Sequence, residues 1–166
     1  MIELANERTK WAGRCIYHLN DSPDLQLFDR DTFDFIYSNV ALQHMHPTCS
    51  KPYLSEFLRV LKPGGVAVFQ LPSELVDPQL RRDYEAIANS PPRPFSTIEM
   101  YGIPREEVID LLKGAAAEVL SVEYDNWAGE EWIGFRYFVR KPAMASSQTA
   151  STSYQASPPA AVKSAI

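Results

Sequence analysis

The sequence predicts an α/β fold in which helices and strands alternate before two final strands form an antiparallel hairpin. Three observations support this prediction. The run VAVFQL, Val66 to Leu71, is apolar almost throughout, which is typical of a strand buried on both faces of a sheet. A helix with clear start and stop signals precedes it, and two strand-like runs joined by a Gly-containing loop come last. We therefore expect a mostly parallel sheet with an antiparallel edge.

The first elements are a helix and two strands. Ile2 to Lys10 is prone to form a helix, and Cys15 to Leu19 (CIYHL) is a short apolar run with β-forming residues. Phe33 to Val40 (FDFIYSNV) follows a polar turn, and its composition predicts a buried strand.

The helix before VAVFQL is marked at both ends. Ser50 is a possible N-cap, and Pro52 lies near the first helical position. An apolar face with the spacing i, i+3, i+4, i+7 follows, made of Leu54, Phe57, Leu58 and Leu61. The Pro63-Gly64-Gly65 turn is expected to stop this helix.

Two further helices and the hairpin complete the prediction. A helix is expected over about Pro78 to Ala88, ended by the prolines that begin at Pro91, and another from about Pro104 to Gly114. Glu118 to Tyr124 and Trp132 to Val139 then predict the paired final strands.

Composition excludes several classes of protein. The net charge is −5, and 45% of residues are hydrophobic, so the chain can bury a core but lacks the basic stripe that nucleic acids or anionic membranes require. Two cysteines, Cys15 and Cys49, stand apart, so neither a disulfide framework nor a metal site is expected. No apolar run is long enough to span a membrane, and we expect a cytoplasmic protein.

The chain divides by composition into a body and a tail. Residues 1–142 carry every predicted element. Residues 143–166 are mostly Ala, Ser and Thr with scattered apolar side chains, which cannot offset the entropy of ordering. We interpret 1–142 as one folded domain and 143–166 as a disordered tail.

One long stretch of the body resembles a known family. The segments FDFIYSNVALQHMHP and YLSEFLRVLKPGGVAVFQLP resemble the middle of class I S-adenosylmethionine-dependent methyltransferases, in the small-molecule branch called type 11 or type 12. The similarity continues into EMYGIPREEVIDLLKG and the final FRYFVRKP. It implies a Rossmann-like sheet, S-adenosylmethionine as cofactor and methyl transfer to a small-molecule acceptor.

The front of the chain departs from the family pattern. The family begins with a strand that ends in a glycine-rich G-x-G-x-G turn, and no two of the seven glycines here have that spacing. The stretch MIELANERTK resembles the family helix that follows the ribose-binding acid. We therefore interpret the chain as an N-terminally truncated methyltransferase sheet, and expect it to bind S-adenosylmethionine weakly or not at all.

The resemblance implies contacts at the ends of two predicted strands. Asp21 and Ser22 stand where the family contacts the adenine, the acid accepting from its amino group and the next backbone N–H meeting a ring nitrogen. An Asx turn of Asn20 or Asp21 explains the same residues without a ligand. Ser38 and Asn39 close FDFIYSN, where the family places residues beside the cofactor's methionine portion and its methyl group.

A histidine-containing segment follows that strand. His44 and His46 lie in Gln43-His44-Met45-His46, which would face the cofactor or the acceptor. Histidine has the unperturbed pKa best suited to proton removal near neutrality, so His44 is the candidate base, although loop histidines are more often simply solvated. Ser38 and Asn39 are expected to matter more, because methyl transfer depends chiefly on alignment.

Two function classes remain open. The chain is either the C-terminal portion of a methyltransferase acting on a small molecule, or a non-catalytic fragment or interaction module that has lost cofactor binding. The acceptor, the atom that is methylated and the oligomeric state do not follow from the sequence.

Overall fold

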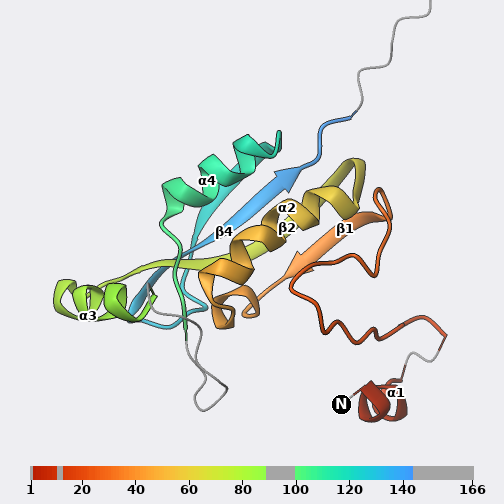
Figure 1. Cartoon of the computed structure of the whole chain (residues 1–166), viewed down its shortest axis with the longest axis horizontal. Coiled ribbons are helices and arrows are strands. Elements are labelled where there is room, and N and C mark those ends of the chain that lie inside the picture. The colour runs from red at the N-terminus through yellow and green to blue at the C-terminus, as the bar shows by residue number, and fades with distance from the viewer. Residues whose placement is uncertain (1, 11–12, 89–99, 144–166) are drawn as a thin grey trace, which may run out of the picture.

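The computed structural model of the chain describes residues 2–10, 13–88 and 100–143. Its elements, shown in Figure 1, are α1 (Ile2–Arg8), β1 (Phe33–Ser38), the 3₁₀ turn η1 (Leu42–His44), α2 (Pro47–Val60), β2 (Leu61–Leu75), α3 (Pro78–Ala88), α4 (Arg105–Gly114), β3 (Glu118–Asp125) and β4 (Trp132–Arg140).

The described strands form one mixed sheet in the order β1-β2-β4-β3. β1 runs parallel to β2, while β4 runs antiparallel to both β2 and β3. The predicted α/β fold with a parallel pair and an antiparallel C-terminal hairpin is confirmed.

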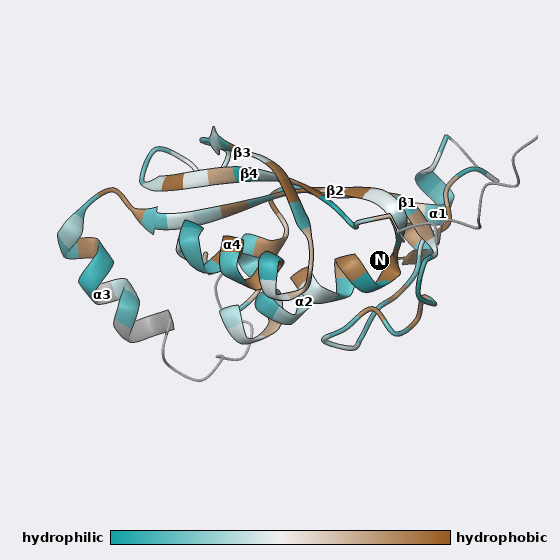
Figure 2. Cartoon of the chain, turned by 90° about the horizontal axis from the view of Figure 1, so that it is seen from above, coloured by the Kyte–Doolittle hydropathy of each residue, from teal (hydrophilic) through white to brown (hydrophobic). Residues whose placement is uncertain are grey.

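Helices α2 and α4 cover one face of this sheet (Figure 2). The ring of Phe69 on β2 lies 6.1 Å from that of Phe57 on α2 and stacks on Tyr137 of β4 at 5.1 Å. Val108 and Leu112 of α4 are buried against the same face. The core therefore lies between β2, β4 and these two helices.

The predicted strand at Cys15 to Leu19 is wrong. These residues have no strand conformation, and the Ile16 and Leu19 side chains are 80% and 77% exposed. A strand is stable only beside a partner, and no described strand lies next to this run. The helix before it ends at Arg8 rather than Lys10, and α1 has no buried residue.

The predicted bounds of the central helix were also wrong at both ends. α2 begins at Pro47, because Nδ1 of His46 accepts a hydrogen bond from the Thr48 N–H and caps the helix; Ser50 is buried inside it. The helix ends at Val60, and Leu61 already pairs with Phe33. The Pro-Gly-Gly segment thus belongs to β2.

The strand predicted over Phe33 to Val40 is present, but it ends at Ser38 and is not buried: β1 is an outer strand of the described sheet, and none of its residues is buried. The strand predicted over Val66 to Leu71 extends over Leu61–Leu75.

The other described elements agree with the prediction. α3 spans Pro78–Ala88 as expected, α4 begins one residue after Pro104, and β3 and β4 are each one residue longer than predicted. The prolines from Pro91 to Pro94 and residues 144–166 lie outside the described residues. None of the described helices is long and apolar enough to cross a membrane.

The chain is fixed tightly where it returns toward α4. The Gly102 N–H donates to the Tyr84 hydroxyl at 2.7 Å, and a Cβ at Gly102 would lie 2.6 Å from the Ser73 carbonyl oxygen and 2.7 Å from the Trp132 ring. Only glycine fits this close approach. Tyr84 on α3 and Gly102 therefore anchor the two sides of residues 89–99.

Candidate functional site

Open α/β sheets usually bind ligands beyond the carboxyl ends of their parallel strands. Here β1 ends at Ser38, opposite Phe69, and β2 continues to Leu75, so the turn after β1 lies beside Gln70 of β2. Asn39, Val40 and then η1 follow Ser38. The structure thus places the predicted pair, Ser38 and Asn39, at the carboxyl end of β1, as expected. Their contacts with a cofactor stay a prediction.

A strained residue lies in this turn. Val40 has φ of +54°, a left-handed conformation that is rare for a β-branched residue. Its N–H is held by Oε1 of Gln70, from β2, at 3.3 Å. Such strain costs about 1–3 kcal/mol and tends to occur at binding and active sites. The turn after β1 is therefore shaped by a side chain from the neighbouring strand.

Some of the buried polar atoms without partners belong to residues at or beside this turn, and others, Arg136 Nε and Tyr137 Oη, belong to β4. Asn39 Oδ1, Gln43 Oε1 and Gln70 Nε2 are buried and have no hydrogen-bond partner within the described part of the chain. Gln43 and Gln70 are only 2% and 1% exposed. Buried polar groups are nearly always paired, so these two acceptors and one donor require a partner, which water or a ligand can supply.

Gln70 was missed by the sequence reasoning, although a signal was present. It is the one polar side chain in the run VAVFQL, whose neighbours are all apolar. A polar residue inside a buried strand needs a partner, and that requirement could have identified it.

The two histidines differ in their surroundings. His44 is exposed at the end of η1, and its Nε2 lies 3.3 Å from Nε2 of Gln43. His46 serves the fold: it caps α2, and its ring packs edge-on against Tyr101 at 5.1 Å. Catalysis by His44 stays a prediction, and the structure places that side chain next to Gln43.

The structure does not bring Asp21 and Ser22 together with Ser38 and Asn39 through any hydrogen bond among the described residues. The Ser22 N–H donates to Oδ1 of Asn20 at 3.3 Å, which is the Asx-turn alternative considered above. Nδ2 of Asn20 also donates to the Tyr53 hydroxyl at 2.7 Å, attaching this loop to α2. Asp21 is exposed. Adenine binding at this loop stays a prediction.

A cavity of about 290 Å³ opens beside the candidate edge, between the end of β2, α3 and the start of α4. Its wall is connected to η1, because the Tyr101 N–H donates to the Gln43 carbonyl at 2.8 Å. Burial raises the pKa of Tyr84, which lines the cavity. Two ion pairs, Glu74–Arg81 and Lys51–Glu107, give it charged walls.

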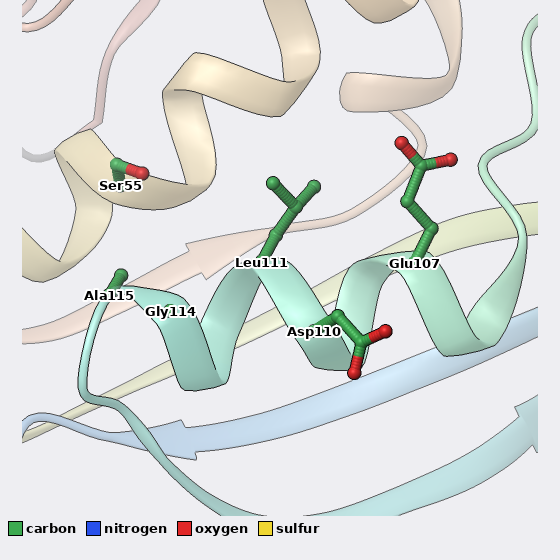
Figure 3. Close-up of a pocket in the computed structure, with 6 residues that line it drawn as sticks. All are labelled: Ser55, Glu107, Asp110, Leu111, Gly114 and Ala115. Atoms are coloured by element: carbon green, nitrogen blue, oxygen red, sulfur yellow. The ribbon is translucent and has the colours of Figure 1, made fainter.

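A larger hollow of about 440 Å³ lies between α2 and α4 (Figure 3). Ser55 reaches it from α2, and the carboxylates of Glu107 and Asp110 on α4 point in different directions. It contains none of the unpartnered polar atoms at the strand ends, so we do not assign it as the site. Among the described residues, no group of His, Cys, Asp and Glu could hold a metal ion.

Comparison with known proteins identifies the fold. Residues 1–69 match a family described as a methyltransferase domain. The chain is similar to a SAM-dependent methyltransferase from Methanosarcina mazei, with 20% identity, a TM-score of 0.64 and coverage of 85% of this chain and 76% of the other. No curated protein sequence matches the chain significantly.

Two further solved structures show how widely this fold is used. The 4+2 cyclase SpnF is 17% identical with a TM-score of 0.58, over 85% of this chain and 60% of its own. An O-methyltransferase family protein from Burkholderia thailandensis is 14% identical with a TM-score of 0.57, and the match covers 80% of this chain and 37% of that protein. At these identities the similarity shows the fold alone. The resemblance inferred from the sequence is thereby confirmed: residues 1–69 match the methyltransferase-domain family, and the chain has the fold of class I S-adenosylmethionine-dependent methyltransferases.

Proposed function

We propose that the chain contributes to S-adenosylmethionine-dependent methyl transfer onto a small-molecule acceptor, with the reaction taking place at the carboxyl ends of β1 and β2. The observation that carries this proposal is the group of unpartnered buried polar atoms, Asn39 Oδ1, Gln43 Oε1 and Gln70 Nε2. They belong to residues at or beside the strained turn at Val40, beyond the carboxyl end of β1, where this fold class binds ligands.

The residues present fit one end of the cofactor. Two acceptors and one donor suit the ammonium and carboxylate of its methionine portion, which is where the resemblance places Ser38 and Asn39. At the adenine end the fit is poorer, because the Ser22 N–H is already bonded to Asn20. A hydrogen bond from the Ser22 N–H to an adenine ring nitrogen would be neutral, and its loss costs ~0.5–1.5 kcal/mol, roughly two- to tenfold in affinity. We therefore expect weak binding by this chain.

When bound, the cofactor supplies an electrophilic methyl group on a sulfonium. The contribution of this chain is then mainly positional: the Val40 turn and Gln70 hold the site in shape, and the adjacent cavity of about 290 Å³ is a place for the acceptor. Where the acceptor must lose a proton, the exposed His44 beside Gln43 is the available base.

The test is a titration of the full chain with S-adenosylhomocysteine, followed by amide NMR. We expect weak binding that shifts the amides of Asn39, Val40, Gln43 and Gln70 but not those of Asp21 and Ser22. Asn39→Ala should abolish these shifts, while the control Asn126→Ala, at an exposed asparagine in the loop after β3, should leave them unchanged.

Two results would contradict the proposal. Absence of shifts at the strand ends, even at millimolar ligand, would favour the alternative of a non-catalytic interaction module. Shifts confined to the hollow between α2 and α4 would place the ligand elsewhere. Methyl transfer itself is tested with radiolabelled cofactor and a panel of small oxygen and nitrogen nucleophiles, and His44→Ala should reduce it less than Asn39→Ala.

A further inference from the structure

The segment of residues 101–105, which we call the strap, is bonded to three other elements of the fold. Each of its backbone N–H groups donates to a neighbouring element: Tyr101 to the Gln43 carbonyl at 2.8 Å, Gly102 to the Tyr84 hydroxyl at 2.7 Å, Ile103 to the Pro72 carbonyl at 3.0 Å and Arg105 to the Ser73 hydroxyl at 3.0 Å. The remaining residue is a proline, which has no N–H. The acceptors belong to η1, α3 and β2, so these elements meet at the strap.

The turn η1 depends on this contact for its orientation. It is a single 3₁₀ turn closed by backbone hydrogen bonds of 3.1 Å, and so short a turn is not stable by itself. The buried Leu42 side chain ties η1 to the core, and the bond from the Tyr101 N–H fixes the carbonyl of the next residue, Gln43. Gln43 Oε1 is one of the unpartnered buried atoms of the strand-end site, by which we mean the turn after β1 with Asn39, Gln43 and Gln70. The placement of that oxygen therefore depends on where the strap holds Tyr101.

Tyr101 is held in part by the residue that follows it. Its ring lies 5.1 Å from that of His46 and 6.5 Å from that of Tyr84. Ring contacts of this kind place a side chain but do not orient the backbone N–H. Both polar groups of Gly102 lie against the Tyr84 hydroxyl, the N–H at 2.7 Å and the carbonyl at 3.4 Å. The hydroxyl thus fixes the peptide group adjacent to the one that bonds Gln43.

Tyr84 is itself well anchored. Its ring packs edge-on against Trp132 of β4 at 5.2 Å, and Trp132 is buried. Burial raises the pKa of the Tyr84 phenol, so the hydroxyl stays protonated near neutral pH and can both accept and donate a hydrogen bond. Tyr84 also lines the cavity of about 290 Å³. One hydroxyl therefore holds the strap and borders the place proposed for the acceptor.

We infer that Tyr84 is a positioning residue for the strand-end site: it holds the strap through Gly102, and the strap sets the orientation of Gln43. Among the described residues, the hydrogen bonds of the Tyr84 hydroxyl run to Gly102 alone, so its effect on the strand ends passes through the strap. The inference rests on the proposed function in one respect, because it takes Gln43 as a contact of the cofactor.

Tyr84→Phe in the full chain, without ligand, tests the first step. Phenylalanine keeps the ring contacts and removes only the hydroxyl, which leaves the Gly102 N–H without its partner. Hydrogen exchange should quicken by about tenfold or more at Tyr101 and Gly102, while Ile103, bonded to β2, keeps its protection. The backbone and side-chain amide signals of Gln43 should shift in the same samples. Tyr124→Phe, at a side chain on β3 that is 68% exposed, should change none of these signals.

The affinity for S-adenosylhomocysteine tests the second step, under conditions where urea unfolding shows each variant to be fully folded. Tyr84→Phe should weaken binding by roughly three- to tenfold. In a chain that already carries Gln43→Ala the same change should have no further effect, because its route to the ligand has been removed. A lower unfolding midpoint with unchanged affinity would show that Tyr84 serves stability alone, and would overturn the inference.

The two sets of measurements separate this inference from the proposed function. If the unaltered chain does not bind S-adenosylhomocysteine, the proposed function fails, and the ligand-free exchange and the Gln43 signals still decide whether Tyr84 positions Gln43. Gln43 signals that stay in place in Tyr84→Phe would overturn the inference. Additive losses of affinity for Tyr84→Phe and Gln43→Ala would also overturn it, because Tyr84 would then act by another route.

Discussion

The segment before β1 and the centre of the sheet are held by different kinds of interaction. In the centre, Leu61, Leu71, Tyr137 and Val139 are completely buried and packed between two strands and two helices. In the segment of residues 2–32, α1 has no buried residue, and the chain is attached to the body mainly by hydrogen bonds to Tyr53, Glu56, Arg59 and Lys141. The stabilisation from the hydrophobic effect increases with the apolar area that is buried, whereas each exposed polar contact contributes little to the free energy of unfolding. We therefore expect stability to be distributed very unevenly along the chain.

Hydrogen exchange should show the largest contrast. Val66 to Phe69 pair with both β1 and β4, and Gln70 and Leu71 pair with β4, so the amides of this run should exchange only through global unfolding, whose free energy is typically about 5–15 kcal/mol. Amides of residues 13–31 should be only weakly protected, because few of them pair with the body of the fold. Equal protection of both regions would contradict the comparison.

A pair of phenylalanines on adjacent strands should show the next largest effect. Phe69→Ala removes a ring that is 1% exposed and contacts Phe57 and Tyr137, so we expect a loss of about 3–5 kcal/mol in the free energy of unfolding. Phe35→Ala should cost less than about 1 kcal/mol because its ring is largely exposed. Urea unfolding measures both, and similar losses would show that β1 is more deeply packed than described.

Arg59 is the main attachment of the N-terminal segment. Its guanidinium donates to the carbonyls of Leu25 at 2.8 Å and Phe28 at 3.0 Å. Because the side chain is partly exposed, Arg59→Ala should lower the free energy of unfolding by about 1–2 kcal/mol. Loss of a fully buried, charged hydrogen-bond network would cost more. Exchange should quicken at residues 25–32 and not in β4. Arg82→Ala, at an exposed arginine on α3, should change stability by less than about 0.5 kcal/mol.

The smallest effect is a pH dependence at the same attachment. The pKa of Glu56 is lowered from its ordinary 4.5, chiefly because the Arg59 guanidinium hydrogen bonds to the carboxylate. A lowered carboxyl pKa stabilises the folded chain above the unfolded-state value, and this stabilisation is lost as the pH falls through the lower folded-state value. The free energy of unfolding, measured between pH 6 and pH 3, should therefore fall less steeply below pH 4.5 for Glu56→Gln than for the wild type. Parallel declines would show that the ion pair contributes nothing measurable.

The sequence predicted the elements of the fold wherever burial follows from local pattern. VAVFQL, the two final strands and the helices around Leu54 and Val108 carry their own apolar periodicity, and all were found. Cys15 to Leu19 carries a similar pattern, but pairing depends on a neighbour that no local pattern specifies. The start of α2 was misjudged because histidine is an unusual N-cap, and Ser50 was the more conventional choice.

The candidate site was predictable in place but not in detail. Polar residues at a strand end identified Ser38 and Asn39, whose location follows from chain order alone. The left-handed conformation of Val40 and its bond to Gln70 could not be predicted, since valine disfavours that conformation and the bond spans 30 residues. Asp21 and Ser22 were assigned by resemblance, and their contacts depend on how the preceding loop lies against α2.

The close approach at Gly102 affects how this protein can be altered. Tyr84 and Gly102 hold the chain on both sides of residues 89–99, so the separation of those two points is set by α3, β2 and Trp132 rather than by the sequence between them. A side chain at Gly102 would meet the Ser73 carbonyl and the Trp132 ring, so it would push Gly102 away from the Tyr84 hydroxyl. Because Tyr84 and Gly102 both line the 290 Å³ cavity, the shape of that cavity depends on a residue that has no side chain.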